Sequence, residues 1–294
     1  MTASDNPASR GGATPPAPVP AGVLVLDKPR GPSSMKAVAV VRGRVLGGLR
    51  RLDAAAMATP APSAGAASGA APGAAPGATP APGRRRRPKV GHAGTLDPLA
   101  EGVLLIGTGA ATRELGRLMG LEKAYRTVID LSAFTSTDDA EGAREPVALD
   151  HPPSREAVGE VVASFRGELE QRPPAFSAVK VEGRRAYALA RGGDAPELPV
   201  RRVRVHEIRL ERYAWPEAEI VLRCDKGFYV RSLARDLGRR LGTGGTCLSI
   251  RREAIGPFTI DEATPLDALP EAVGEAELMP LGVVRERLAA WRAG

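Results

Sequence analysis

Thirty consecutive residues divide the N-terminal half of the chain into two parts. Positions 54–83 consist of Ala, Pro, Gly, Ser and Thr apart from Met57, and they carry no charge. Their prolines recur too often for a helix, and the segment has no large side chains to bury. Positions 1–21 have a similar composition. We therefore expect a disordered tail over 1–21 and a disordered insert at about 50–88 within one folded domain over 22–260.

The rest of the chain contains enough apolar residues for a folded core. Hydrophobic residues make up 43% of the 294, which excludes disorder over the whole chain. The formal net charge is +7, and such an excess of cations favours a polyanionic partner such as a nucleic acid. Charge alone leaves a merely basic, soluble surface equally open.

Cysteine and histidine usage excludes several classes of site. Cys224 and Cys247 lack a CxxC spacing, and the three histidines stand far apart in the sequence. We therefore expect neither a disulfide framework nor a metal site. No apolar run approaches the roughly 20 residues that a membrane span needs, and the first residues lack a signal-peptide pattern. These features predict a cytoplasmic protein that does not bind membranes.

Short apolar runs alternate with helical patterns along the remaining sequence. Ser33 or Ser34 can cap a helix. The apolar face of that helix is predicted to contain Met35, Val38, Val41 and Val45. Ser154 can cap another, and a further helix is predicted to end at about Leu241.

The apolar positions between Val203 and Leu210 alternate as in a strand, but their phase shifts by one residue. This shift predicts a β-bulge near His206 and Glu207. Because the predicted strands are not regularly separated by helices, the order of elements indicates a mixed α+β fold.

The most informative segment is GHAGTLDPLAEG at 91–102, which runs into an apolar strand pattern at 103–106. Gly91 and Gly94 permit close backbone approach or a positive φ before Asp97. Pro98 fixes the chain directly after Asp97 and biases it away from helical conformations. A carboxylate is thus expected on a stiff loop. Since Asp before Pro is also common in turns and caps, local physics leaves a catalytic and a structural Asp97 both open.

Further blocks occur in order on both sides of this segment. They are GVLVLDKPRG at 22–31, KAYR at 123–126, TSTDDAEG at 135–142, QRPPAFSAVK with GRRAY at 171–187, KGFYVRSL at 226–233 and IRR at 250–252. Together these blocks resemble the bacterial tRNA pseudouridine-55 synthases, the TruB family, and the number of ordered blocks makes the signal specific. The resemblance implies the α+β pseudouridine synthase fold, with an extended, mostly antiparallel mixed sheet, flanking helices and a central RNA-binding cleft.

The resemblance implies catalytic roles for three residues. Asp97 would be the nucleophile, and Arg231 would pair with it and keep it ionised. Tyr125 would stack on the target base, which must leave its stack before Asp97 can reach it. Core packing is the alternative for Tyr125, and a solvated helix face is the alternative for Arg231. Arg235 and Arg239, at i+4 and i+8, suit that solvated face better or would face phosphates.

Five more positions are implied to bind the substrate. Tyr229 would line the pocket, His92 would hold displaced nucleotides at its entrance, and Ile250 would pack on the uracil. Lys28 and Pro29 would form a wall beside the site. Each of three positions also has a structural alternative. Ile250 and Tyr229 could be ordinary core residues, an alternative that fits Ile250 equally well, and His92 could be a turn residue whose ring is hydrogen-bonded to backbone.

The resemblance also implies partners and their limits. The substrate would be the T-arm of tRNA at uridine 55, and the protein would be a monomer with no obligatory protein partner. An isomerisation has no redox change and no energy input, so no cofactor is expected. Positions 261–294 are too few for the RNA-binding barrel that commonly ends this family, and we expect a short C-terminal extension instead. Two alternatives stay open: a related synthase with another RNA target, and a tRNA-binding chaperone that acts without catalysis.

Overall fold

The computed structural model describes residues 17–58, 87–177 and 198–293, together with 180, 181, 184–186 and 189. The predictions for the tail over 1–16 and for the insert over 59–86 lie outside these residues, as does Tyr187 in the GRRAY block. Among the described helices, none combines the length and the hydropathy that a membrane span requires.

Strands make up most of the regular structure. They are β1 (Gly22–Lys28), β2 (Val90–His92), β3 (Ala100–Thr108), β4 (Lys123–Asp130), β5 (Ala133–Thr135), β6 (Arg144–Pro146), β7 (Gly167–Gln171), β8 (Lys180–Val181), β9 (Arg184–Arg185), β10 (Arg201–Ala214), β11 (Glu217–Cys224), β12 (Thr246–Ile255), β13 (Phe258–Thr259) and β14 (Thr264–Pro265). The helices are α1 (Ser34–Ala58), α2 (Leu115–Met119), α3 (Arg155–Ala163), α5 (Val230–Leu241) and α6 (Leu281–Ala293), with 3-10 turns η1 (Gly109–Arg113) and η2 (Ile260–Glu262).

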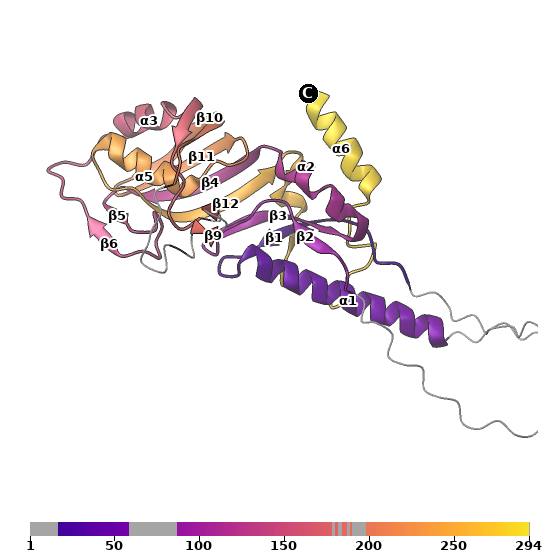
Figure 1. Cartoon of the computed structure of the whole chain (residues 1–294). Coiled ribbons are helices and arrows are strands. Elements are labelled where there is room, and N and C mark those ends of the chain that lie inside the picture. The colour runs from indigo at the N-terminus through magenta and orange to yellow at the C-terminus, as the bar shows by residue number, and fades with distance from the viewer. Residues whose placement is uncertain are drawn as a thin grey trace, which may run out of the picture.

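A ten-stranded sheet organises the described chain (Figure 1). Its order is β14-β1-β3-β12-β4-β11-β10-β7, with β2 beside β3 and β13 beside β12. Only β1 with β14 and β3 with β12 run parallel, and the other pairs of this sheet are antiparallel. The predicted mixed α+β class with a mostly antiparallel sheet is confirmed.

The sheet is buried on both faces at its β1–β3 side. Successive side chains of a strand point to opposite faces, so Leu24 and Leu26 join the core beneath α1, whereas Val23 and Val25 join a second core with α6. This explains why the apolar runs of β1 and β3 are continuous rather than alternating.

On the other side of the sheet, only one face is apolar. Helices α3 and α5 pack there (Figure 1) on strand residues such as Ile220 and Leu222. The opposite face of the same strands carries ion pairs, including Arg126 with Glu219 at 2.7 Å. The predicted β-bulge is confirmed in β10, where the register with β11 shifts between Val205 and Glu207.

Helix α1 agrees with its prediction in its cap and its buried valines but differs from it at Met35 and at its end. Ser33 caps it, accepting a hydrogen bond from the Lys36 amide at 3.2 Å, and Val38, Val41 and Val45 are buried as predicted. Met35 is 60% exposed, so its predicted inward position is wrong. The buried stripe of α1 runs through Ser34, Ala37 and Val38 instead, which leaves Met35 on the solvent side of the first turn. The helix also continues to Ala58, past the predicted start of the insert near residue 50, because Leu, Arg and Ala favour helix until Pro60 approaches.

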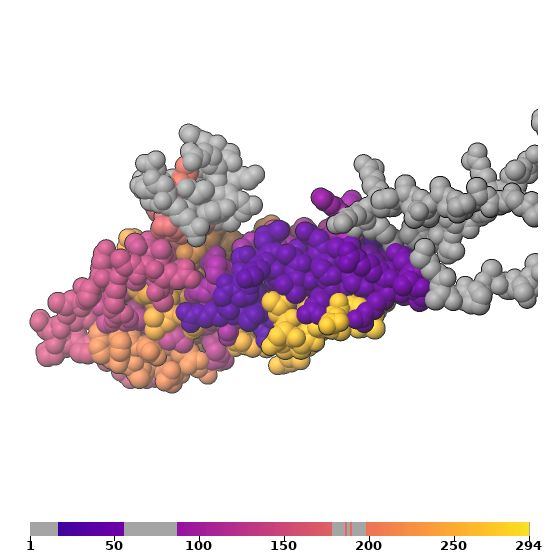
Figure 2. All heavy atoms as spheres, turned by 90° about the horizontal axis from the view of Figure 1, so that it is seen from below, coloured from indigo at the N-terminus to yellow at the C-terminus, as the bar shows by residue number. Residues whose placement is uncertain are grey.

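The residues after 260 pack onto the folded domain. Strand β14 pairs with β1, and the Met279 amide donates to Val23 O at 2.8 Å. The segment near 271–273 lies along α1 (Figure 2). The approach is close enough that a Cβ added to Gly48 would meet Val273 O at 2.7 Å. The C-terminal extension is therefore part of the same core.

Candidate active site

The loop that carries Asp97 is held by the opening block of the sequence. Ser34, buried at the start of α1, accepts a hydrogen bond from the Leu96 amide at 2.8 Å and donates one to Leu96 O at 2.9 Å. The Gly31 amide donates to Pro98 O at 2.7 Å. The residues directly before and after Asp97, Leu96 and Pro98, are thus both fixed by hydrogen bonds.

Asp97 faces an arginine from the start of α5. Its Oδ2 lies 2.7 Å from Arg231 Nη2, and the two side chains are 38% and 4% exposed. No backbone amide of the described residues donates to the Asp97 carboxylate, so it does not serve as a cap or turn ligand there. The Asp97 carboxylate is thus paired with a buried cation on one side and remains accessible on the other.

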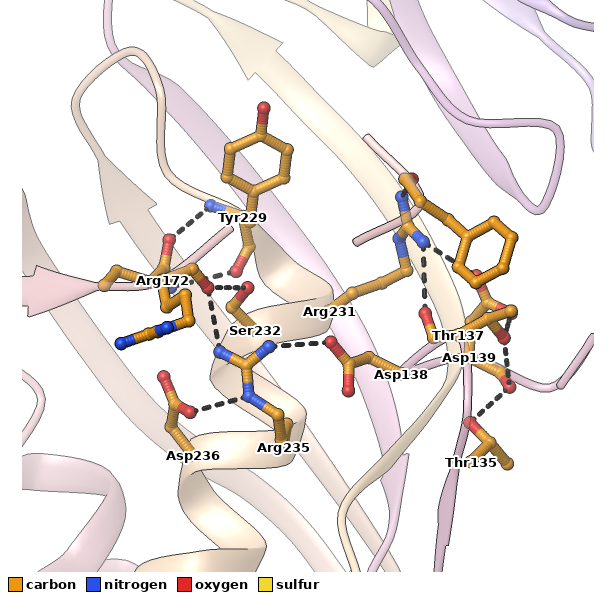
Figure 3. A network of polar contacts seen from close by, with 12 residues as sticks. Thr135, Thr137, Asp138, Asp139, Arg172, Tyr229, Arg231, Ser232, Arg235 and Asp236 are labelled. Atoms are coloured by element: carbon orange, nitrogen blue, oxygen red, sulfur yellow. Dashed lines mark hydrogen bonds and ion pairs between the residues drawn. The ribbon is translucent and has the colours of Figure 1, made fainter. Parts of the chain in front are cut away.

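Arg231 is fixed on its other side by a loop (Figure 3). Its Nη1 lies 3.2 Å from Asp139 Oδ2 and donates to Thr137 O at 3.1 Å, while Nη2 donates to Phe176 O at 2.8 Å. No local sequence pattern distinguishes Asp139 from its neighbours. A guanidinium with this many fixed acceptors cannot turn away from Asp97.

The loop at 135–142 presents the carboxylates of Asp138 and Asp139 to one face of α5 (Figure 3). Thr137 Oγ1 donates to Asp139 Oδ1 at 2.5 Å, and Asp138 adopts a positive φ of 61°. Asp138 Oδ2 then lies 2.8 Å from Arg235 Nη1. The prediction that Arg235 is solvated or faces phosphates is wrong, because Asp138 and the Arg172 carbonyl neutralise it inside the protein. Arg239 is exposed.

Tyr229 begins α5 and is held by a buried amide. Gln171, 1% exposed, accepts from the Tyr229 amide at 2.8 Å and donates to Tyr229 O at 3.0 Å. The Arg201 guanidinium lies 5.9 Å from the centre of the Tyr229 ring. Burial raises the pKa of Tyr229, so the phenol stays protonated near neutral pH.

Gln171→Ala is expected to lower the free energy of unfolding by roughly 1–3 kcal/mol, because it leaves the Tyr229 amide without its acceptor and removes one of the two donors to Tyr229 O, the other being the Leu233 amide. Urea denaturation measures this directly. Glu170→Ala, on the exposed neighbour, is the control and should change stability by less than about 0.5 kcal/mol. A Gln171→Ala protein as stable as the parent would show that the amide does not hold the start of α5.

A cavity of about 290 Å³ opens in front of Asp97. Five of the predicted site residues line it together: Asp97, Tyr125, Tyr229, Arg231 and Ile250. They come from the catalytic loop, β4, the start of α5 and β12. The described residues contain no group of three metal-ligating side chains.

Three predicted site residues do not line this cavity. Lys28 is fully buried, and its Nζ donates to Pro29 O and Pro32 O, both at 2.8 Å. Burial lowers the pKa of Lys28 to about 8. Pro29 is exposed on the loop that Lys28 shapes, and that loop contacts Pro98 through Gly31. Lys28 and Pro29 thus lie behind the catalytic loop.

His92 precedes the same loop and is partly exposed. Its Nδ1 is buried and has no hydrogen-bond partner among the described residues, which argues against a turn histidine satisfied by backbone through that atom. Burial lowers the pKa of His92, so the ring is neutral at physiological pH.

The cavity also has lining residues that the sequence reasoning missed. Arg252, Lys123 and Ser177 are all buried and line it. The two-residue repeat of a strand offered a signal for Arg252, because it lies on the same face of β12 as Ile250. Burial raises the pKa of Tyr125, and the neighbouring Arg252 opposes that shift.

Comparisons with known proteins agree with this geometry. The family model described as "TruB family pseudouridylate synthase (N terminal domain)" matches residues 84–230. A relative from Thermobifida fusca, named tRNA pseudouridine synthase B, is 45% identical over 204 residues, covering 66% of this chain and 68% of the relative. A relative of the same name from a Mycobacterium species is 45% identical over 187 residues, which is 62% of this chain and 63% of that protein. The chain thus spans somewhat less than two thirds of the Mycobacterium relative.

A solved structure shares the fold. A chain in a crystal structure of a Cbf5–Nop10–Gar1 complex superposes with a TM-score of 0.55 at 25% identity, over 84% of this chain and 52% of that one. The expected pseudouridine synthase fold is confirmed. On its sequence, its sheet and its matched family model, the chain belongs to the TruB family of pseudouridylate synthases.

Proposed function

We propose that this protein converts uridine 55 in the T-arm loop of tRNA to pseudouridine, with Asp97 as the nucleophile. The observation that carries the proposal is the ion pair of Asp97 and Arg231 at the wall of a cavity that Tyr125, Tyr229 and Ile250 also line. The names of the relatives support tRNA as the substrate class.

The reaction exchanges one bond of the target uridine for another. The C1′–N1 glycosidic bond breaks, the uracil turns, and its C5 forms a new bond to C1′. C5 loses its proton and N1 gains one, so the product is an isomer of the substrate. Asp97 suits the role of transient partner because a carboxylate oriented by Arg231 is a competent nucleophile and a good leaving group.

The two tyrosines suit a base that has left its stack. Extrusion of a nucleotide from a folded loop costs a few kcal/mol, and stacking on an aromatic ring offsets part of that cost. Tyr125 of β4 and Tyr229 at the start of α5 both line the cavity. Ile250 adds an apolar wall, which favours a flat uracil over solvent.

Tritium release from tRNA transcripts made with [5-³H]uridine tests the proposal, because loss of the C5 proton accompanies each conversion. We expect one tritium released per tRNA, and none from a transcript in which uridine 55 is replaced by cytidine. Release that persists from the replaced transcript would indicate another RNA target. Tight tRNA binding without any release would indicate a chaperone.

A further inference from the structure

Arg252 is the largest fully buried side chain in the described chain, with 1% of its surface exposed. Its Nε donates to Val103 O at 2.7 Å, and its Nη2 donates to Gly94 O at 3.1 Å. No ion pair joins it to a carboxylate of the described residues. Arg231, which lines the same cavity, has two such partners. Among the described residues, Arg252 is therefore a buried cation held by two carbonyl oxygens and the neighbouring Tyr125 hydroxyl, with no carboxylate in contact.

Two other buried cations share this arrangement. The Lys28 ammonium donates to two carbonyls, and so does that of Lys123, to Met119 O and Leu121 O. Burial is the main cause that lowers the pKa of each lysine to about 8, and the charge of Arg252 lowers both further. Arg252 and Lys123, which line the cavity, thus carry positive charges that no described carboxylate neutralises by contact, and Lys28 adds a third behind the catalytic loop.

An ionised side chain is costly to bury without an opposite charge. Ionisable groups in such costly environments are found most often at functional sites, where the charge takes part in binding or catalysis. Arg252 lies at such a site, since it lines the same cavity as Asp97 and lies beside Tyr125.

We propose that Arg252 supplies a fixed positive charge that stabilises the negative charge developing on the uracil ring. This inference rests on the proposed function. When Asp97 attacks C1′, its oxygen forms a bond to that carbon, the C1′–N1 bond breaks, and the electron pair passes into the ring and spreads over O2 and O4. If Asp97 instead adds to C6, the displaced pair spreads onto O4 as well. The ring becomes anionic by either route, and the charge disappears when C5 joins C1′ and the carboxylate is released.

Arg252 would act through its electric field rather than by contact. Its side chain lines the cavity beside Ile250 and Tyr125 but is only 1% exposed, so its charge lies at the cavity wall and is largely screened from solvent by protein. Charges act more strongly in such an enclosed site than in water, and a prearranged charge needs no reorganisation during the reaction.

The competing explanation is mechanical. Arg252 ties the catalytic loop at Gly94 to strand β3 at Val103, and its loss could simply misplace Asp97. Charge and tethering are separated by two substitutions. Arg252→Lys keeps the charge and loses the planar donor set, whereas Arg252→Gln keeps hydrogen-bonding capacity and loses the charge.

Single-turnover conversion of tRNA is the measurement. We expect Arg252→Gln to lower the rate by roughly 10²–10³-fold and Arg252→Lys by about tenfold or less, while the thermal midpoint of Arg252→Gln is unchanged or higher. Equal losses in the two variants, with a lowered thermal midpoint in both, would overturn the proposal in favour of tethering.

A substituted substrate gives a second, independent readout. Fluorine at C5 withdraws electrons and stabilises an anionic uracil, so the ratio of parent to Arg252→Gln rates should shrink with 5-fluorouridine at the target position. Consumption of the starting nucleoside is followed by chromatographic separation and quantification after digestion. Ser34→Ala, which removes a neutral tether from the same loop, is the control and should show the same ratio with both substrates. If the ratio of parent to Arg252→Gln rates is the same for uridine and 5-fluorouridine, the inference is also overturned. If the parent protein converts neither substrate, the proposed function itself fails.

Discussion

Asp97→Asn should abolish conversion of tRNA, with a rate reduced by at least on the order of 10⁴-fold, while tRNA binding stays within a few-fold of the parent protein. The amide has nearly the shape of the carboxylate but is not a nucleophile, so the loss falls on chemistry rather than on recognition. Single-turnover kinetics and a filter-binding isotherm on the same protein separate the two quantities.

The control for this substitution is Asp225→Asn. Asp225 also lines the cavity, but its carboxylate lies 3.0 Å from His206 rather than beside Arg231. If the cavity needed only negative charge, both variants would lose activity alike. We expect Asp225→Asn to retain a rate within about tenfold of the parent, because it leaves the reacting carboxylate in place. Activity above about one percent in Asp97→Asn would contradict the assignment of the nucleophile.

Arg231→Lys is expected to lower the single-turnover rate by roughly 10²–10³-fold and the free energy of unfolding by roughly 1–3 kcal/mol. The guanidinium serves Asp97, Asp139 and two carbonyls at once. An ammonium keeps the charge but cannot direct donors to all four acceptors. The Asp97 carboxylate would then be free to rotate, and Asp139 would lose part of its neutralisation.

Arg235→Lys provides the matched control for that result. Arg235 lies one turn along the same helix and makes the equivalent contacts to Asp138 and the Arg172 carbonyl, but it does not reach Asp97. We expect a loss of stability similar to that of Arg231→Lys with a rate within about tenfold of the parent. Rates that fall equally in both variants would mean that the arginines act only by holding the loop at 135–142.

Local sequence patterns predicted the elements well where a single periodicity decides the outcome. The phase shift in β10 located its bulge, and the serines at 33 and 154 cap their helices. Met35 shows a limit of such patterns: hydrophobicity favoured Met35 for the buried side of α1, whereas the less apolar Ser34 and Ala37 occupy it. The continuation of α1 to Ala58 shows a second limit. Alanine is common both in helices and in the low-complexity insert, so composition alone did not locate the boundary between the two.

The site was predictable as a set of residues but not as a network. Asp97, Tyr125, Tyr229, Arg231 and Ile250 do line one cavity. Arg235 was misjudged because the carboxylate that neutralises it stands 97 positions earlier in the chain, and no local pattern reports such a distance. Lys28 was placed at the cavity wall, whereas its ammonium is folded back onto the carbonyls of its own loop.

Pseudouridine mapping of tRNA incubated with the purified protein tests the central claim most directly. Carbodiimide labelling followed by alkali leaves a stable adduct on pseudouridine but not on uridine, so the labelled position can be located in the RNA although the two nucleosides have the same mass. The account predicts pseudouridine at position 55 after treatment with the parent protein and only uridine there after treatment with Asp97→Asn, with both proteins bound to the RNA. An unmodified position 55 with the parent protein, or a modified one with Asp97→Asn, would contradict it.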